Sequence, residues 1–146
     1  NAQLDKIIEY ISNGNLTDVG ILVYYNDQVK QIRDYFQSRG IPVQWKTKDA
    51  MEINFKSTSP KIITWHCAKG LQFNDVFIPC CGLDEYKQYV QWSHEPMTEK
   101  KSALYVATTR PLENLYLLYT NNLAPLLPNP NSPVYSGNTG SNSGPF

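Results

Sequence analysis

Residues that can bind phosphate groups are concentrated in two short segments of this 146-residue chain. Residues 64–73 read Thr-Trp-His-Cys-Ala-Lys-Gly-Leu-Gln-Phe, and residues 104–110 read Leu-Tyr-Val-Ala-Thr-Thr-Arg. Hydroxyl, imidazole and ammonium groups bond phosphate oxygens, and the guanidinium of Arg110 is a planar fork of donors that keeps its charge. Gly70 lets the backbone approach a ligand closely. The two segments therefore carry groups that are able to bind an anionic ligand.

The elements around these segments predict where the polar groups lie. The first segment follows a β-like run at residues 61–65 and precedes another at 74–79, so it connects two strands. The second lies on a helical pattern that starts at Thr98 and Glu99, and Pro111 disfavours helical geometry at Arg110. A last strand is expected at residues 115–119. This layout places the reactive groups at the ends of core elements, where ligands of open α/β sheets bind.

The first 60 residues predict a β-α-β unit preceded by a helix. Apolar spacing predicts a helix over residues 3–13, a buried parallel strand over 18–25, and a second helix that Asn26 caps and Gly40 ends. A short strand follows at residues 41–45, then a loop at 46–60 with a helical turn near 49–53. Residues 82–97 are expected to be a loop with some helix. The alternation of helices and strands predicts a three-layer α/β fold with a mostly parallel sheet and helices on both faces.

The two segments together resemble motifs V and VI of the UvrD/Rep-like superfamily 1 DNA helicases. Those motifs run approximately T-x-H-x-x-K-G-L-E-F and L-Y-V-A-x-T-R-A, and their order, spacing and flanking strands agree with this chain. The resemblance implies the second, C-terminal RecA-like domain of a helicase motor over residues 3–120, without the large inserted subdomain of many relatives. Residues 121–146, rich in Pro, Asn, Ser and Gly, are expected to form a tail.

The resemblance also implies a nucleotide site. Arg110 corresponds to the motif VI arginine that reaches the γ-phosphate of ATP, and is the expected catalytic residue. Lys69, Gly70, Gln72 and Arg110 are the expected ATP-binding residues, with Gln72 standing where the family has a Glu thought to bond the ribose. No G-x-x-x-x-G-K-[ST] motif is present, because no Gly in the chain is followed by Lys. ATP and Mg²⁺ would therefore be bound jointly with a missing N-terminal RecA-like lobe, and the chain alone is expected to be inactive.

Three further positions match nucleic-acid contacts of the family. Asn26, Thr64 and His66 are the expected DNA-binding residues, which would bond the backbone of single-stranded or duplex DNA without reading its sequence. Tyr24 stands where the family has Arg, so a stacking or hydroxyl contact could replace a phosphate contact. Trp65 alternates away from Thr64 and His66 and is expected in the core. Each role has a structural alternative: Asn26 as a plain helix cap, Thr64 and His66 as buried strand-end residues, and Arg110 as a partner of the helix dipole.

Composition bounds these expectations. Lysine plus arginine and aspartate plus glutamate each total 13, so the formal net charge is zero and any nucleic-acid contact must be local. No membrane span or signal peptide is evident, and three cysteines with a vicinal pair suit reduced thiols in a cytoplasmic protein. A zinc site of His66, Cys67, Cys80 and Cys81 lacks the usual spacing, so no metal site is expected. The chain begins with Asn1, which suggests a fragment of a longer protein.

Two functions from other classes remain as alternatives to the motor. One is a degenerate helicase-like module that binds nucleic acid or a protein without hydrolysing ATP, which Tyr24, Gln72 and Pro111 favour because they depart from the family pattern. The other is a free-standing enzyme that uses Asp84 or Glu85 with a metal, for which no motif is present. The main hypothesis is the C-terminal lobe of an ATP-dependent DNA helicase or translocase.

Overall fold

The computed structural model describes residues 2–47, 51–82 and 107–123, together with positions 127, 131 and 133. Its helices and strands have the following bounds: α1 Ala2–Gly14, β1 Val19–Val23, α2 Asn26–Ser38, β2 Gln44–Lys46, β3 Met51–Glu52, β4 Lys61–Thr64, the short 3-10 helix η1 His66–Ala68, β5 Phe73–Ile78 and β6 Pro111–Leu117. The strands form one sheet in the order β3-β2-β4-β1-β5-β6. All neighbours pair in parallel except β3, which is antiparallel to β2. The predicted mostly parallel sheet is confirmed.

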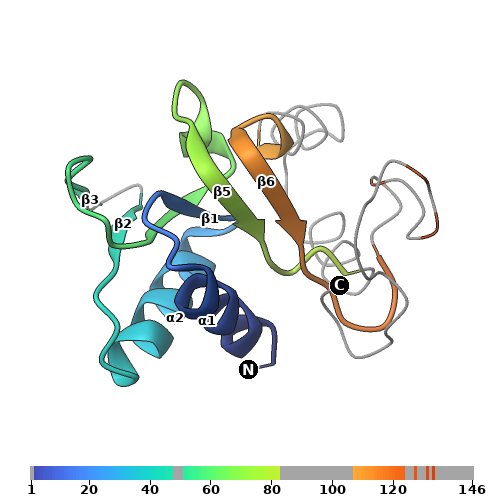
Figure 1. The fold of residues 1–146 in the computed structure, drawn as a ribbon, viewed down its shortest axis with the longest axis horizontal. Coiled ribbons are helices and arrows are strands. Elements are labelled where there is room, and N and C mark those ends of the chain that lie inside the picture. The colour runs from blue at the N-terminus through green and yellow to red at the C-terminus, as the bar shows by residue number, and fades with distance from the viewer. Residues whose placement is uncertain are drawn as a thin grey trace.

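Helices α1 and α2 lie side by side on one face of the sheet (Figure 1). Apolar side chains at helical spacing face the strands in both helices, and the middle strand β1 is buried along its whole length. The buried residues on this face are Leu4, Ile7, Val19, Ile21, Val23, Val29, Ile32, Phe36, Val43, Ile62, Phe77 and Leu118. The β1 strand therefore reads as a continuous apolar run because both of its faces are covered.

The opposite face carries a second core. Its members include Leu22, Ile63, Phe73, Val76 and Ile78 from the strands, with Ala68 from η1 and Ala107 packed over them. Ala107 and Thr108 are helical, and Ala107 is fully buried. The end of the helix predicted over residues 98–110 thus covers this face, which confirms a three-layer α/β fold. The rest of that prediction, residues 98–106, lies outside the described residues. Leu123 bridges to Gly82, and Leu127 packs against this core.

Several local predictions are wrong for identifiable reasons. Asn26 is the first residue of α2 rather than its N-cap, because the Gln28 side chain accepts hydrogen bonds from the backbone N–H groups of Tyr25 (2.8 Å) and Tyr24 (3.1 Å), which makes Tyr25 the cap. Residues 51–52, expected in a helical turn, pair with β2 as the edge strand β3. The strand expected at residues 41–45 begins at Gln44, after Pro42. The last strand extends upstream to Pro111.

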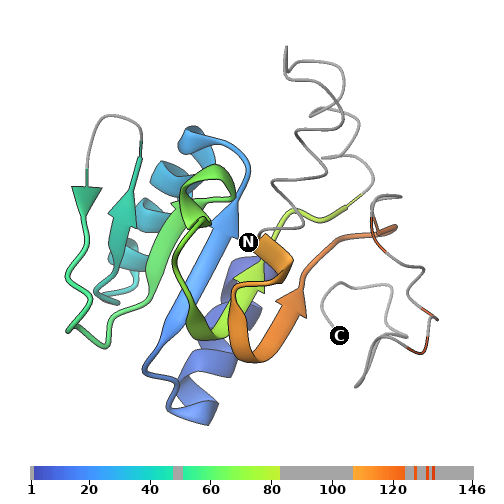
Figure 2. The ribbon, with the colours of Figure 1, turned by 90° about the horizontal axis from the view of Figure 1, so that it is seen from above.

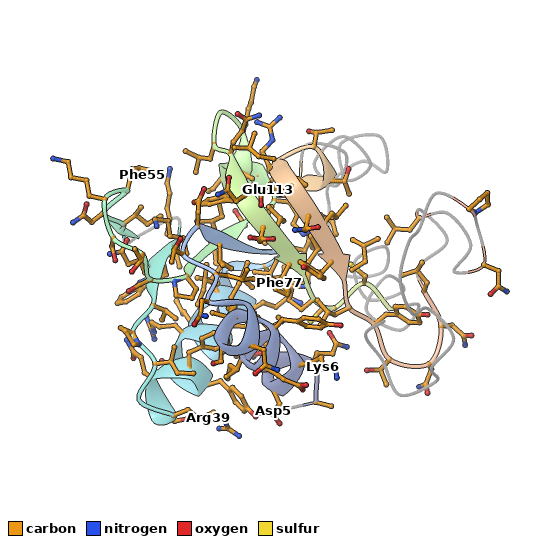
Figure 3. All side chains as sticks on the ribbon, viewed as in Figure 1. Asp5, Lys6, Arg39, Phe55, Phe77 and Glu113 are labelled. Atoms are coloured by element: carbon orange, nitrogen blue, oxygen red, sulfur yellow. The ribbon has the colours of Figure 1, made fainter. Side chains whose placement is uncertain are left out.

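Asp5 of α1 links the exposed sides of α1 and α2 through a hydrogen bond and an ion pair (Figure 3). The Tyr35 hydroxyl donates to Asp5, and the Arg39 guanidinium lies 3.4 Å from Asp5 and 3.9 Å from the centre of the Tyr35 ring. The Tyr35 hydrogen bond, aided by the charge of Arg39, lowers the pKa of Asp5 below its usual 3.8. Ionised Asp5 therefore stabilises the folded chain above pH 3.8, and this contribution is lost as the pH falls through the lowered pKa.

We expect Asp5→Asn to reduce the acid sensitivity of the fold. The parent chain should lose stability between pH 6 and pH 3, whereas the variant should lose less over the same range, because its amide does not titrate. Urea midpoints at the two pH values measure the difference. Tyr35→Phe, which removes the donor, should behave in the same way. A variant as acid-sensitive as the parent would show that this contact does not influence folding.

Candidate functional site

The connection between β4 and β5, residues 65–72, runs from one end of the strands to the other. Strands β4 and β5 both pair in parallel with β1, and Thr64 at the end of β4 lies beside Val23, whereas Asp75 near the start of β5 lies beside Val19. The chain must therefore return from the carboxyl end of β4 to the amino end of β5. Val19 and Val23 are the first and last residues of β1, and at about 3.3 Å per residue the four steps between them span roughly 13 Å. The predicted site residues thus fall into two groups at opposite ends of the sheet.

The carboxyl-end group contains the three residues expected to bind DNA. Thr64 ends β4, His66 begins η1, and Asn26 begins α2 directly after β1, the neighbour of β4. The Thr64 hydroxyl accepts a hydrogen bond from the Cys67 N–H at 3.3 Å and is 5% exposed, so it holds the turn that carries His66. His66 is exposed and Asn26 is half-buried. The imidazole of His66 is therefore the most accessible polar group of the three.

Aromatic rings support this end of the sheet. The Tyr24 ring lies 5.2 Å from Trp65, 5.6 Å from His66 and 4.7 Å from Tyr25, measured between ring centres. Trp65 is 4% exposed, which confirms its prediction as a core residue. Tyr24 is only 6% exposed, so its ring packs against His66 and presents no open face on which a nucleic-acid base could stack. Tyr25 is half-buried, and this burial raises the pKa of its hydroxyl.

The amino-end group contains the residues expected at the nucleotide. Lys69, Gly70 and Gln72 are exposed on the connection before β5, and Arg110 precedes β6. The Arg110 Nη1 donates to the Leu71 carbonyl at 3.3 Å, and Nη2 donates to the Thr109 hydroxyl at 3.1 Å. Both views show the connection before β5 and the turn before β6 next to each other (Figure 2). The half-buried Arg110 is thereby tied to the connection that carries Lys69, Gly70 and Gln72.

Gly70 sets the direction of this connection. Its φ of +82° lies in the left-handed region, where a side chain is strained even though an added Cβ would meet no atom within 4 Å. Gly40, which follows the end of α2, has a φ of +72° and equally open surroundings. The two glycines therefore carry the same backbone constraint, but only Gly70 precedes the carbonyl that binds Arg110.

We expect Gly70→Ala and Gly40→Ala each to lower the free energy of unfolding by about 1 kcal/mol, because both place a Cβ in the left-handed region. On the hypothesis that this group contacts ATP, only Gly70→Ala should also weaken ATP hydrolysis by the full-length protein, since a strained residue at position 70 redirects the Leu71 carbonyl. Urea denaturation and ATPase assays measure the two effects. Equal hydrolysis by both variants would remove Gly70 from the candidate site.

The cysteines give no sign of a metal centre. Cys67, Cys80 and Cys81 form no disulfide bond, and the thiol of the buried Cys81 donates to the Ile78 carbonyl at 3.1 Å. Over residues 2–47, 51–82 and 107–123, no group of three His, Cys, Asp or Glu side chains could hold a metal ion. Asp84 and Glu85 lie outside the described residues. Among the described residues, we find no helix with the length and hydropathy of a membrane span.

Two comparisons relate the chain to known proteins, and a third finds nothing. Residues 45–122 match the family described as the UvrD-like helicase C-terminal domain, which is more than half of the chain. The fold is similar to a crystal structure described as the C-terminal domain of a possible DNA helicase from Lactobacillus plantarum WCFS1, with a TM-score of 0.63 and 17% sequence identity over 86% of this chain and 71% of that one. No curated protein matches the sequence.

Proposed function

Because this chain belongs to the UvrD-like helicase C-terminal domain family, we propose that it is the C-terminal motor lobe of an ATP-dependent DNA helicase or translocase. The observation that supports this most is the position of Arg110. Its half-buried guanidinium donates to the Thr109 hydroxyl and to the carbonyl of Leu71, the residue between Gly70 and Gln72 in the chain. A fixed, permanently charged fork suits a phosphoryl group that gains negative charge in the transition state.

This lobe would act on ATP that another lobe holds. The chain lacks a glycine-rich phosphate loop, so ATP and Mg²⁺ would be held chiefly by an N-terminal RecA-like lobe of the same protein. Arg110 would reach the γ-phosphate across the interface. Lys69 would contribute a point charge to a phosphate or to a carboxylate of the opposing lobe, and Gln72 would accept a hydrogen bond from the ribose through its amide oxygen.

Movement along DNA would follow from the separation of the two groups. ATP binding would close the lobes on the nucleotide at the amino-end group, and hydrolysis would open them. Asn26 and His66 at the other end of the sheet would hold the backbone of single-stranded DNA during this cycle, with Thr64 fixing the turn of His66. Phosphate contacts of this kind position a strand without selecting a sequence, as a translocating motor requires.

DNA-stimulated ATP hydrolysis by the full-length protein tests the proposal. The full-length protein should hydrolyse ATP faster with single-stranded DNA, and the isolated 146-residue lobe should not hydrolyse it. A full-length protein that binds DNA without hydrolysing ATP would contradict the motor and support a non-motor binding module. This second function is favoured by Tyr24, Gln72 and Pro111, which differ from the residues usual in the family.

We expect His66→Ala to weaken single-stranded DNA binding by roughly three- to tenfold, because it removes one exposed hydrogen-bonding ring from the carboxyl-end group. The loss should be similar for different base sequences. Fluorescence anisotropy with labelled oligonucleotides measures it in the full-length protein. Lys6→Ala, which removes a surface charge from α1, is the control. An equal loss in both variants would indicate a general charge effect instead of a contact by His66.

A further inference from the structure

The main chain of Arg110 is fixed from both sides. Its N–H donates to the Ala107 carbonyl at 3.3 Å, and its carbonyl accepts from the Phe73 N–H at 3.1 Å, where β6 joins β5. The Cα position of Arg110 therefore follows the sheet and the end of the helix. These backbone hydrogen bonds do not fix the direction of the long side chain. An arginine has many rotamers, and it loses much conformational entropy when one of them is selected.

Among the described residues, two acceptors from different segments bind the guanidinium and favour one direction. The Leu71 carbonyl comes from the connection before β5, and the Thr109 hydroxyl comes from the residue next to Arg110. Both of these acceptors are uncharged, so neither of them neutralises the guanidinium. Thr109 is β-branched, which restricts its own side-chain rotation and makes its hydroxyl a defined acceptor. Nothing in the proposed function assigns a role to Thr109.

We propose that Thr109 is a positioning residue that orients the guanidinium of Arg110 toward the γ-phosphate. This inference rests on the proposed function, because it gives Thr109 a role only through Arg110. In the resting lobe the hydroxyl binds Nη2 and the Leu71 carbonyl binds Nη1, so the plane of the fork is set before the lobes close. Preorganised donors act on a transition state without a cost of reorientation during the reaction.

The test is a double-mutant cycle on the full-length protein. Thr109→Val removes the hydroxyl at nearly constant volume, and we expect it to lower kcat for ATP hydrolysis about tenfold, the effect of one lost hydrogen bond to a charged group, with KM for ATP nearly unchanged. Thr109→Ser keeps the hydroxyl and should restore most of the rate. In the Arg110→Ala background, Thr109→Val should have no further effect, measured by single-turnover hydrolysis, which resolves very slow reactions.

Each outcome decides between positioning and a structural role. If Thr109→Val lowers the rate by the same factor with and without Arg110, or if Thr109→Ser is as impaired as Thr109→Val, the inference is overturned. The inference is also overturned if Thr109→Val hydrolyses ATP like the parent while Arg110→Ala is impaired. In that case the proposed function is retained without a role for Thr109. If Arg110→Ala itself is as fast as the parent, the proposed function fails together with the inference. Melting temperatures of all variants show whether each one is folded.

Discussion

Replacing Arg110 with alanine is expected to lower kcat for DNA-stimulated ATP hydrolysis by the full-length protein about a thousandfold, the lower range for removal of an arginine finger. The reason is that the guanidinium would interact mainly with charge that develops on the γ-phosphate in the transition state. Binding of ATP in the ground state would depend mostly on the other lobe, so KM should change by no more than about threefold. Steady-state kinetics at saturating DNA measure both constants.

The matched control is Arg39→Ala. Arg39 is also a surface arginine near a helix end, but it pairs with Asp5 at 3.4 Å on the side of the helices. This variant should hydrolyse ATP like the parent. If Arg110→Ala and Arg39→Ala have the same activity, Arg110 makes no contribution to the reaction. If Arg110→Ala raises KM strongly and leaves kcat intact, Arg110 binds the nucleotide but does not act as a finger.

Replacing Gly20 with alanine is expected to have the largest effect on stability. Gly20 lies in the middle strand β1, and an added Cβ would come 2.5 Å from Cδ2 and 2.8 Å from Cε2 of the Phe73 ring. Phe73 is 2% exposed, so its ring has little space into which it can move. Overpacking of this kind costs about 2–3 kcal/mol of unfolding free energy, which should lower the melting temperature by roughly 5–10 °C.

Gly20→Ala should also impair hydrolysis in molecules that remain folded. The Phe73 N–H donates to the Arg110 carbonyl, so a displaced Phe73 shifts the backbone that carries the arginine. Ile21→Val, at the adjacent buried position of β1, should cost only about 1 kcal/mol and leave hydrolysis unchanged. Thermal denaturation and ATPase assays below the transition compare the two. A Gly20→Ala variant as stable as the parent would show that the ring can move aside at no cost.

The sequence predicted the main elements well where apolar periodicity was strong. Helix α1, the buried strand β1, helix α2 and strands β4 and β5 were expected within one or two residues, because burial on one or two faces imposes a clear pattern. Weaker signals failed. The two-residue strand β3 depends on pairing with β2 and has no periodicity of its own. The cap of α2 depends on the Gln28 side chain reaching back to Tyr25, although Asn26 is intrinsically the better capping residue.

Motif spacing proposes the residues of the candidate site but not their layout, and their roles stay predictions. Motif spacing identified Thr64, His66, Gly70 and Arg110, but only the parallel register shows that the first two lie at the carboxyl end of β4 and the last two near the amino ends of β5 and β6. The hydrogen bond from Arg110 to the Leu71 carbonyl joins residues 39 positions apart, which no local pattern can specify. The burial of Tyr24 depends on Trp65 and His66, so its sequence position alone suggested an accessible ring.

The affinity of the full-length protein for a transition-state mimic tests the central claim most directly. ADP with aluminium fluoride imitates the phosphoryl group during transfer, whereas a non-hydrolysable ATP analogue imitates the ground state. We predict that Arg110→Ala weakens binding of the mimic by two to three orders of magnitude and binding of the analogue by less than about fivefold. Equal affinities of parent and variant for the mimic would contradict the claim that this lobe delivers a charge to the γ-phosphate.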